Sequence, residues 1–459
     1  MFIRRNLLEK LCRWSSEPAP KPMLILGAEQ VGKTTLVKTL AKKFDQVISV
    51  NLSESSERKI FERGYSPEEL RDALFFCKEV TTGPKRTLLF LDEIHLSAQA
   101  MQAVAGLSAR CKDLLLIATS SVITTEIGQW IHHPSKLVNA VTLHPCSFAE
   151  YLDAIGEPSA IEAYHEVPVP TSSYAKLLRH FHLYMLIGGM PEVLGRFCEE
   201  KHLTAIKPIY EKILVNWNTS LASAFPSAKS GLLQFTLQNS FPFAATRIKF
   251  HCFGNSEFRS REMGEAFRIL EQRQLIKLIY PATTMLNPLL INREKSPRLQ
   301  LLDTGMVNHF SGIQKQLFQS DDMNALFHGQ IARQAAGQEL LAAESAGDDR
   351  VGFWVRNKPQ SRAEVDFVIS HDGMLIPVEV KSGEPGSLRS LHQFVDHSPH
   401  PFAIRLHAGE LSIRQTQTIS GHRFYLLSLP YFLAGRIVPH LDGFIRYVNS
   451  SPARGKTGI

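Results

Sequence analysis

The sequence predicts an α/β protein whose N-terminal part is a parallel sheet covered by helices on both faces. Three observations support this: apolar runs alternate with helical segments, one run leads into a glycine-rich loop, and another ends in two carboxylates. Uninterrupted apolar strands separated by helices are typical of parallel sheets buried on both faces. The runs are MLILG (23–27), VISVN (47–51), LLFLD (88–92), LLLIAT (114–119) and NAVTL (139–143).

Length and composition limit the class of protein. A chain of 459 residues is longer than one ordinary domain, so we expect about two to four domains. Hydrophobic residues are 44% and charged residues 21% of the chain, which excludes a wholly disordered or low-complexity protein. The net charge of +7 is a mild basic excess that is compatible with a nucleic acid as partner.

The cysteines and the apolar segments indicate the compartment. Six cysteines are scattered without a CxxC pair, which indicates reduced thiols rather than a disulfide framework or a zinc site. No stretch reaches the roughly 20 apolar residues of a membrane span, and the N-terminus lacks the apolar core of a signal peptide. We therefore expect a cytoplasmic protein without a membrane partner.

Other segments show how the chain is organised. Leu7, Leu8, Leu11 and Trp14 have the spacing of an amphipathic helix, and residues 148–235 are mainly helical in pattern. Residues 258–281 should form a helix that runs straight into a strand, as in a winged helix, although many small α+β units share this pattern.

The glycine-rich segment GAEQVGKT (27–34) fits the phosphate-binding pattern GxxxxGK[ST] and lies between a strand and a helix, as that pattern requires. Its glycines let backbone amides face a phosphate, Lys33 supplies a charge to the β- and γ-phosphates, and Thr34 can bind Mg²⁺. The alternative is a glycine-rich turn with an exposed lysine. The expected nucleotide-binding residues are Gly27, Ala28, Glu29, Gln30, Val31, Gly32, Lys33, Thr34 and Thr35.

Two carboxylates, Asp92 and Glu93, stand at the end of the run 88–92, at the carboxyl edge where open α/β sheets bind ligands. We expect Asp92 to hold Mg²⁺ and Glu93 to orient and deprotonate the attacking water. A purely structural role for both is the alternative. At the end of the next run, Ser120 and Thr119 are candidates for contact with the γ-phosphate, and a helix cap is the alternative there.

Together these motifs resemble those of the prokaryotic AAA-type ATPases with a C-terminal domain similar to PD-(D/E)xK nucleases, a domain of uncharacterised function. The resemblance implies a P-loop ATPase that uses ATP and Mg²⁺. The matching segments are GAEQVGKTTL, FLDEIH, ATSS, LHPCSFAEYL (143–152), IGGMPEV (187–193), IKF (248–250), LLDTGM (301–306) and EVDFVI…IPVEVKSGE (364–384). The expected parts are an ATPase domain with an N-terminal helix (1–150), a helical lid (151–235), a winged-helix-like unit (236–298) and a nuclease-like domain with a basic tail (299–459).

The chain departs from the family at one arginine. Members usually carry a Gly-Arg pair a few residues before the proline of the segment that matches LHPCSF, and Lys136 and Leu137 stand there instead. If that arginine stabilises phosphate, the ATP cycle is slow or assisted differently. Lys136 and Arg110 are candidate substitutes, and a merely solvated Arg110 is the alternative.

The C-terminal resemblance rests on three residues. Asp366 lies near the start of one predicted strand, and Glu379 and Lys381 are two apart on the next, so they share a face. Such carboxylates can bind Mg²⁺, and the lysine can activate water. Where the family has a helical glutamate that completes the metal site, this chain has Arg333, which opposes a cation. Glu339, turned 240° further round the helix, cannot replace it.

Three readings follow. In the first, which we favour, a Mg²⁺-dependent ATPase controls a nuclease-like C-terminal module that is associated with DNA. The alternatives are an ATP-regulated metal-dependent nuclease, and a slow ATP-bound switch that binds nucleic acid or protein without cleaving it. Arg259, Arg261 and Arg268 are candidates for phosphate contacts, with a solvated helix face as the alternative. The oligomeric state, the type of nucleic acid and the biological process stay open.

Overall fold

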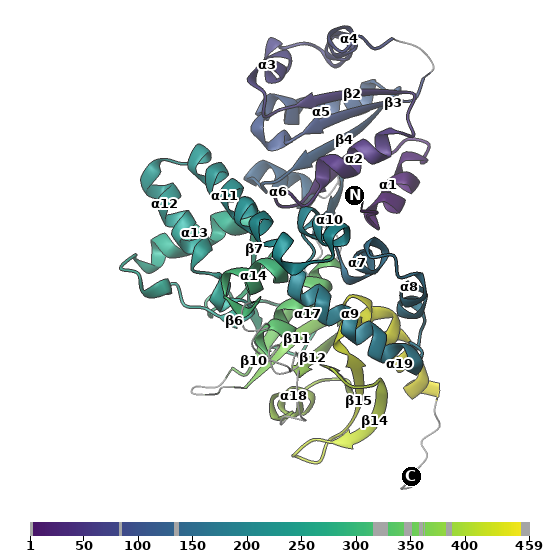
Figure 1. Cartoon of the computed structure of the whole chain (residues 1–459), viewed down its shortest axis with the longest axis vertical. Coiled ribbons are helices and arrows are strands. Elements are labelled where there is room, and N and C mark those ends of the chain that lie inside the picture. Colours follow the sequence, from purple (N-terminus) through teal and green to yellow (C-terminus); the bar gives the residue numbers. More distant parts are fainter. Residues whose placement is uncertain are drawn as a thin grey trace.

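The computed structural model describes residues 3–81, 85–132, 137–314, 329–343, 351–357, 361, 363–381 and 388–450. Within these ranges the strands form three sheets, which follow one another along the long axis of the molecule (Figure 1). No helix in the same ranges combines the length and the apolar character that a bilayer span requires.

The N-terminal part is a five-stranded parallel sheet with the order β2-β3-β4-β1-β5, as the apolar runs predicted. Its strands are β1 (Met23–Leu26), β2 (Gln46–Asn51), β3 (Thr87–Asp92), β4 (Leu114–Ser120) and β5 (Asn139–Thr142). Its helices are α1 (Leu7–Ser15), α2 (Lys33–Ala41), α3 (Ser55–Arg58), α4 (Pro67–Cys77), α5 (Ala98–Arg110) and α6 (Thr125–His132). Leu11 and Trp14 of α1 are buried, which confirms the amphipathic N-terminal helix.

A layer of helices follows this sheet in the chain, and part of the layer lies between this sheet and the C-terminal sheet (Figure 1). Ser147 and Glu150 start it with a reciprocal capping box, in which each side chain accepts from the other's backbone amide. The six helices that follow confirm the helical pattern predicted over residues 148–235. The helices are α7 (Phe148–Ala154), α8 (Pro158–His165), α9 (Tyr174–Ile187), α10 (Pro191–Glu200), α11 (Lys207–Ala224) and α12 (Ser227–Gln238).

The second sheet is small and antiparallel, with the order β6-β9-β7, and α13 (Ser260–Gln272) runs directly into β7 as predicted. Its strands are β6 (Thr246–Arg247), β7 (Ile276–Ile279) and β9 (Arg298–Leu301). The proposed boundary at residue 298 lies within β9, because this strand pairs back with β6 and β7.

The third sheet has seven strands in the order β14-β15-β13-β12-β11-β10-β8. Neighbouring side chains of β11 lie on opposite faces of this sheet. Phe367 belongs to the hydrophobic core on the side of α17 (Gln330–Ala342), and Val368 belongs to a second cluster on the side of α18 (Arg389–Val395). The strands are β8 (Pro281–Ala282), β10 (Val351–Val355), β11 (Glu364–His371), β12 (Met374–Lys381), β13 (Phe402–His407), β14 (Ser412–Gln417) and β15 (Arg423–Pro430). The helices are α14 (Thr304–Phe310), α17 (Gln330–Ala342), α18 (Arg389–Val395) and α19 (Ile437–Ser450).

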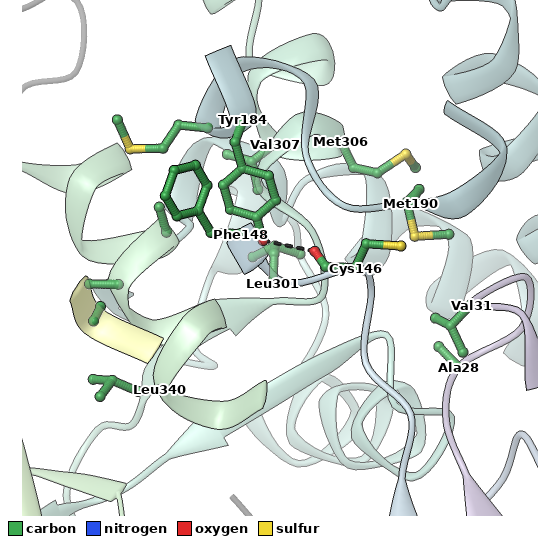
Figure 2. Packing of buried hydrophobic residues seen from close by; sticks show 14 of the residues in the cluster. Ala28, Val31, Cys146, Phe148, Tyr184, Met190, Leu301, Met306, Val307 and Leu340 are labelled. Carbon is green, nitrogen blue, oxygen red and sulfur yellow. Dashed lines mark hydrogen bonds between the residues drawn. The ribbon is translucent and has the colours of Figure 1, made fainter. Parts of the chain in front are cut away.

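One hydrophobic core connects all three parts. Buried residues from the glycine-rich loop, the helical layer and the C-terminal part belong to a single cluster, and Figure 2 shows several of them around Cys146. Phe148 packs edge-on against Phe181 with ring centroids 5.0 Å apart. The Tyr184 hydroxyl oxygen lies 2.9 Å from the carbonyl oxygen of Cys146, a contact that the dashed line of Figure 2 marks. The glycine-rich loop is therefore connected to the C-terminal part by one continuous, packed interior.

Candidate functional site

The glycine-rich loop has the backbone that its glycines permit. Gly32 has φ +96°, in the left-handed region, and a Cβ on Gly27 would lie 2.4 Å from the carbonyl oxygen of Leu143. Lys33 is buried, and its Nζ donates to the carbonyls of Gly27 at 2.8 Å and Ala28 at 3.1 Å. The loop therefore holds its lysine inside, unlike the alternative of a turn with an exposed lysine.

The two predicted carboxylates meet this loop at the end of β3. The Thr34 hydroxyl donates to Asp92 Oδ2 at 2.9 Å, and Lys33 Nζ lies 3.3 Å from Glu93 Oε1. Glu93 has φ +55°, a left-handed backbone that costs energy for a residue with a side chain. A hydroxyl and a carboxylate suited to Mg²⁺ thus lie beside a carboxylate suited to water activation.

The end of β4 supports both carboxylates. The Thr119 hydroxyl donates to Asp92 Oδ1 at 2.5 Å and accepts from the amide of Glu93 at 3.0 Å. Ser121 donates to Glu93 Oε2 from its amide at 2.8 Å and from its hydroxyl at 2.7 Å. Ser120 points to the other face, since strand side chains alternate, and its Oγ donates to the carbonyl of Val122 at 2.7 Å.

Ser120 nevertheless has an indirect link to the site. Its Oγ lies 3.1 Å from His95 Nδ1, which in turn lies 3.3 Å from Glu93 Oε2. Burial lowers the pKa of His95, so its imidazole is neutral at pH 7. Burial raises the pKa of Glu93, but the Lys33 charge and the hydrogen bonds from Ser121 outweigh this and hold it below its ordinary value. Glu93 is therefore ionised at neutral pH, as a proton acceptor must be.

Two arginines that no motif indicated contact the loop. Arg5, from the segment before α1, donates to the carbonyl of Val31 at 2.8 Å and forms an ion pair with Glu150 at 3.1 Å. Arg273, at the end of α13, has its Nη1 3.4 Å from Glu29 Oε1. Of the substitutes proposed from the sequence, Arg110 is 65% exposed at its side chain and pairs with Glu68 at 3.5 Å, whereas Lys136 lies outside the described residues.

The three predicted C-terminal residues also come together. Lys381 Nζ lies 2.8 Å from Glu379 Oε1, and Asp366 Oδ2 accepts from the amide of Val380 at 2.9 Å. Arg333 Nε lies 2.7 Å from Asp366 Oδ1, so the arginine occupies the place predicted for it and pairs with the carboxylate. Burial, then the Asp366 charge, raises the pKa of Glu379 to about 7.

A second arginine strengthens this neutralisation. Arg298 is fully buried, donates to the carbonyl of Asp366, and forms an ion pair with Glu364. Its Nη2 also lies 3.8 Å from Asp366 Oδ1. Both carboxylate oxygens of Asp366 therefore have partners, and a metal ion would have to displace Arg333.

The remaining predicted residues have other surroundings. Glu339 is buried and accepts from the amide of Phe148 at 3.0 Å, which confirms that it does not replace the missing glutamate. Arg259, Arg261 and Arg268 are exposed. In the described residues, one group of side chains has ligand atoms within 4.8 Å of one another, namely His371, Asp372 and Asp442, at the turn between β11 and β12 and on α19.

Sequence comparison matches three family models to separate parts of the chain. Residues 19–152 match the AAA domain, residues 178–317 match a domain of unknown function (DUF8612), and residues 328–431 match a second domain of unknown function (DUF4143). No curated protein matches the chain.

Several solved structures resemble the chain at low sequence identity. The Walker-type ATPase PABY2304 of Pyrococcus abyssi is 12% identical with a TM-score of 0.43, over 68% of this chain and 96% of that one. A Signal Transduction ATPase with Numerous Domains with a tetratricopeptide repeat sensor, PH0952 from Pyrococcus horikoshii, is 13% identical with a TM-score of 0.28, over 75% of this chain and 46% of that one. Drosophila ORC bound to DNA is 13% identical with a TM-score of 0.26, over 67% and 85%.

The family match and the fold agree on the N-terminal part. The matched residues 19–152 contain the parallel sheet, the glycine-rich loop and the carboxylates at the end of β3. The chain is thus an ATPase, with a P-loop domain of the AAA type at its N-terminal end.

Proposed function

We propose that this ATPase depends on Mg²⁺ and that its nucleotide state controls the C-terminal nuclease-like module, which associates with DNA. The observation that carries the proposal is the meeting of Lys33, Glu93 and Ser121. Lys33 neutralises the β- and γ-phosphates, and Glu93, held by Ser121, accepts the proton of the attacking water. Ser120 acts through His95.

The donors beside the loop fit a magnesium ion. The Thr34 hydroxyl and the Asp92 carboxylate are hard oxygen donors that already lie 2.9 Å apart. Bound Mg²⁺ would neutralise charge that develops on the phosphates. Thr119 holds Asp92 from the other side, so the carboxylate is oriented before the ion arrives.

Control of the C-terminal module has a physical route. The loop residues Ala28 and Val31 belong to the same packed core as Phe148 of the helical layer and Leu340 of α17 (Figure 2). Because a densely packed interior transmits displacement, a change at the loop can reach the C-terminal part. The exposed arginines of α13 and the basic excess of the chain support a DNA partner.

Phosphate release with Lys33→Ala and Glu93→Gln, with and without DNA, tests this function. We expect Lys33→Ala to lose ATP binding, and Glu93→Gln to keep binding while hydrolysis falls at least about a hundredfold. DNA should change the rate of the unmodified protein. Equal hydrolysis by all three proteins would refute the assignment of these residues.

Two alternatives have observations of their own. Asp366, Glu379 and Lys381 share one site, which favours an ATP-regulated nuclease. The ion pairs of Asp366 with Arg333 and Arg298 favour a switch that binds without cleaving. Cleavage assays with Mg²⁺ or Mn²⁺ separate the two: cleavage that Asp366→Ala abolishes supports the nuclease, and binding without cleavage supports the switch.

A further inference from the structure

Three polar side chains from distant parts of the chain meet beside the glycine-rich loop. Ser220 of α11 donates to Glu29 Oε1 at 2.5 Å, and Arg273 Nη1 donates to Ser220 Oγ at 2.9 Å. The same Nη1 lies 3.4 Å from Glu29 Oε1. Glu29 belongs to the loop, so this cluster ties the ATP site to α11 and α13.

Arg273 is held in place with little solvent around it. Its side chain is 11% exposed, and its guanidinium lies 5.5 Å from the ring centroid of Phe225. The backbone next to it is joined to the end of β4, since the amide of Ile123 donates to the carbonyl of Gln272 at 2.7 Å. Burial lowers the pKa of Arg273, and the charge of Glu93 partly opposes this effect.

The loop therefore carries a negatively charged side chain, Glu29, at the place where the phosphates of ATP would bind. The amides of residues 27–34 and Lys33 attract phosphates, whereas the Glu29 carboxylate repels them. Arg273 attracts both, and as a planar cation with several donors it can hold either a carboxylate or a phosphate. A triphosphate with its terminal group near Glu93 competes with Glu29 for this arginine.

We infer that Arg273 exchanges Glu29 and Ser220 for the terminal phosphate of ATP, and that this exchange reports the nucleotide state to α11 and α13. The inference rests on the proposed ATP site and adds its regulation. ADP lacks the terminal phosphate and leaves the Glu29–Arg273 pair intact. Because Glu29 competes with the terminal phosphate for Arg273, the strength of the Glu29–Arg273 pair determines how tightly ATP must bind before α11 and α13 respond.

Binding of fluorescent ATP and ADP analogues to the full chain tests the exchange. We expect Arg273→Gln to weaken ATP about tenfold or more, as loss of a charged hydrogen bond does, and to leave ADP unchanged. Arg273→Lys should restore part of the ATP preference. Glu29→Gln should tighten ATP, because it removes both the repulsion and the competitor. Arg446→Gln, at an exposed position of α19 away from the loop, is the control for loss of one positive charge and should change neither affinity.

The outcomes separate this inference from the function on which it depends. If the unmodified chain binds neither nucleotide, the proposed ATP site itself fails. If it binds both, but Arg273→Gln and Glu29→Gln leave the ratio of ATP to ADP affinity unchanged, the cluster is only a structural tether and the exchange is refuted. Opposite shifts of that ratio in the two variants would establish it.

Discussion

The carboxylate of Glu339 in α17 accepts a hydrogen bond from the backbone amide of Phe148, the first residue of α7, at 3.0 Å. The Tyr184 hydroxyl donates to the same oxygen at 2.6 Å. Both donors come from the helical layer next to the ATPase domain, whereas Glu339 belongs to the C-terminal part. A buried carboxylate thus joins the helical layer to the C-terminal part.

Glu339→Gln should make stability less dependent on pH. Burial, opposed by the hydrogen bonds from Tyr184 and Phe148, raises the pKa of Glu339 to about 7. Between the ordinary glutamate value and pH 7 the unfolded chain releases this proton and the folded chain keeps it, so stability falls as pH rises through that window. The cost is about 1.4 kcal/mol per pKa unit. As pH rises from 5 to 8, the melting temperature of the variant should increase relative to that of the unmodified protein. A constant difference between the two melting temperatures would contradict this.

Gly189→Ala should lower the free energy of unfolding by about 3 kcal/mol. A Cβ at this position would lie 2.1 Å from the carbonyl oxygen of Cys146, and backbone atoms cannot easily move aside. The Gly189 carbonyl accepts from the amide of Cys146 at 2.6 Å, and its amide donates to Asp303 at 2.6 Å. Gly195→Ala, in helix α10 with open space around the new Cβ, should instead stabilise by about 0.5–1 kcal/mol. Urea unfolding compares the two, and equal effects would refute the steric argument.

Ser121→Ala should slow ATP hydrolysis about tenfold, because residues that orient a reacting group have effects of this size. Ser121 holds Glu93 Oε2 with its hydroxyl, whereas Ser120 reaches Glu93 only through His95. Ser120→Ala should therefore have the smaller effect on turnover number. Turnover at saturating ATP provides the measurement, and a larger loss for Ser120→Ala would reverse the assigned roles.

Arg333→Glu should create a cation site in the C-terminal part. The substitution removes the positive charge 2.7 Å from Asp366 Oδ1 and adds a carboxylate beside Asp366 and Glu379. Affinity for Mn²⁺, measured by titration calorimetry with Asp92→Ala in the background, should rise about tenfold or more. Arg389→Glu, at an exposed position of α18, controls for the change in net charge. If both variants bind Mn²⁺ equally, Arg333 does not exclude the ion.

Local sequence patterns predicted the parts of the fold that local interactions determine. The five strands of the first sheet, the loop 27–34 and the pair Asp92–Glu93 follow from apolar runs and a short motif. Arg333 was expected beside the C-terminal carboxylates, and it lies there. The strands and the loop need only a few neighbouring residues to be recognised, whereas the place of Arg333 was expected from the family resemblance.

Contacts between distant segments were beyond such patterns. Arg273 lies 244 residues after Glu29, and Arg5 reaches Val31 from the segment before α1. Neither arginine lies in a motif. An arginine can pair with an acceptor from a distant segment, so it needs no fixed sequence pattern around it. Ser121 lies two residues after Thr119 and therefore on the same side, but it follows the end of the apolar run, so no pattern singled it out, although its amide and hydroxyl both donate to Glu93.

The path of the chain between β7 and α14 determines how the molecule could be divided. After β7 the chain leaves the middle sheet, and β8 pairs with β10 of the C-terminal sheet. The chain then returns to the middle sheet, where β9 pairs with β7 and brings Arg298 against Asp366. A gene fusion or truncation at residue 298 would strip one edge strand from the C-terminal sheet. It would also leave Glu364 and Asp366 without their buried counter-charge. The middle and C-terminal parts are therefore expected to be inherited and exchanged between proteins as one piece.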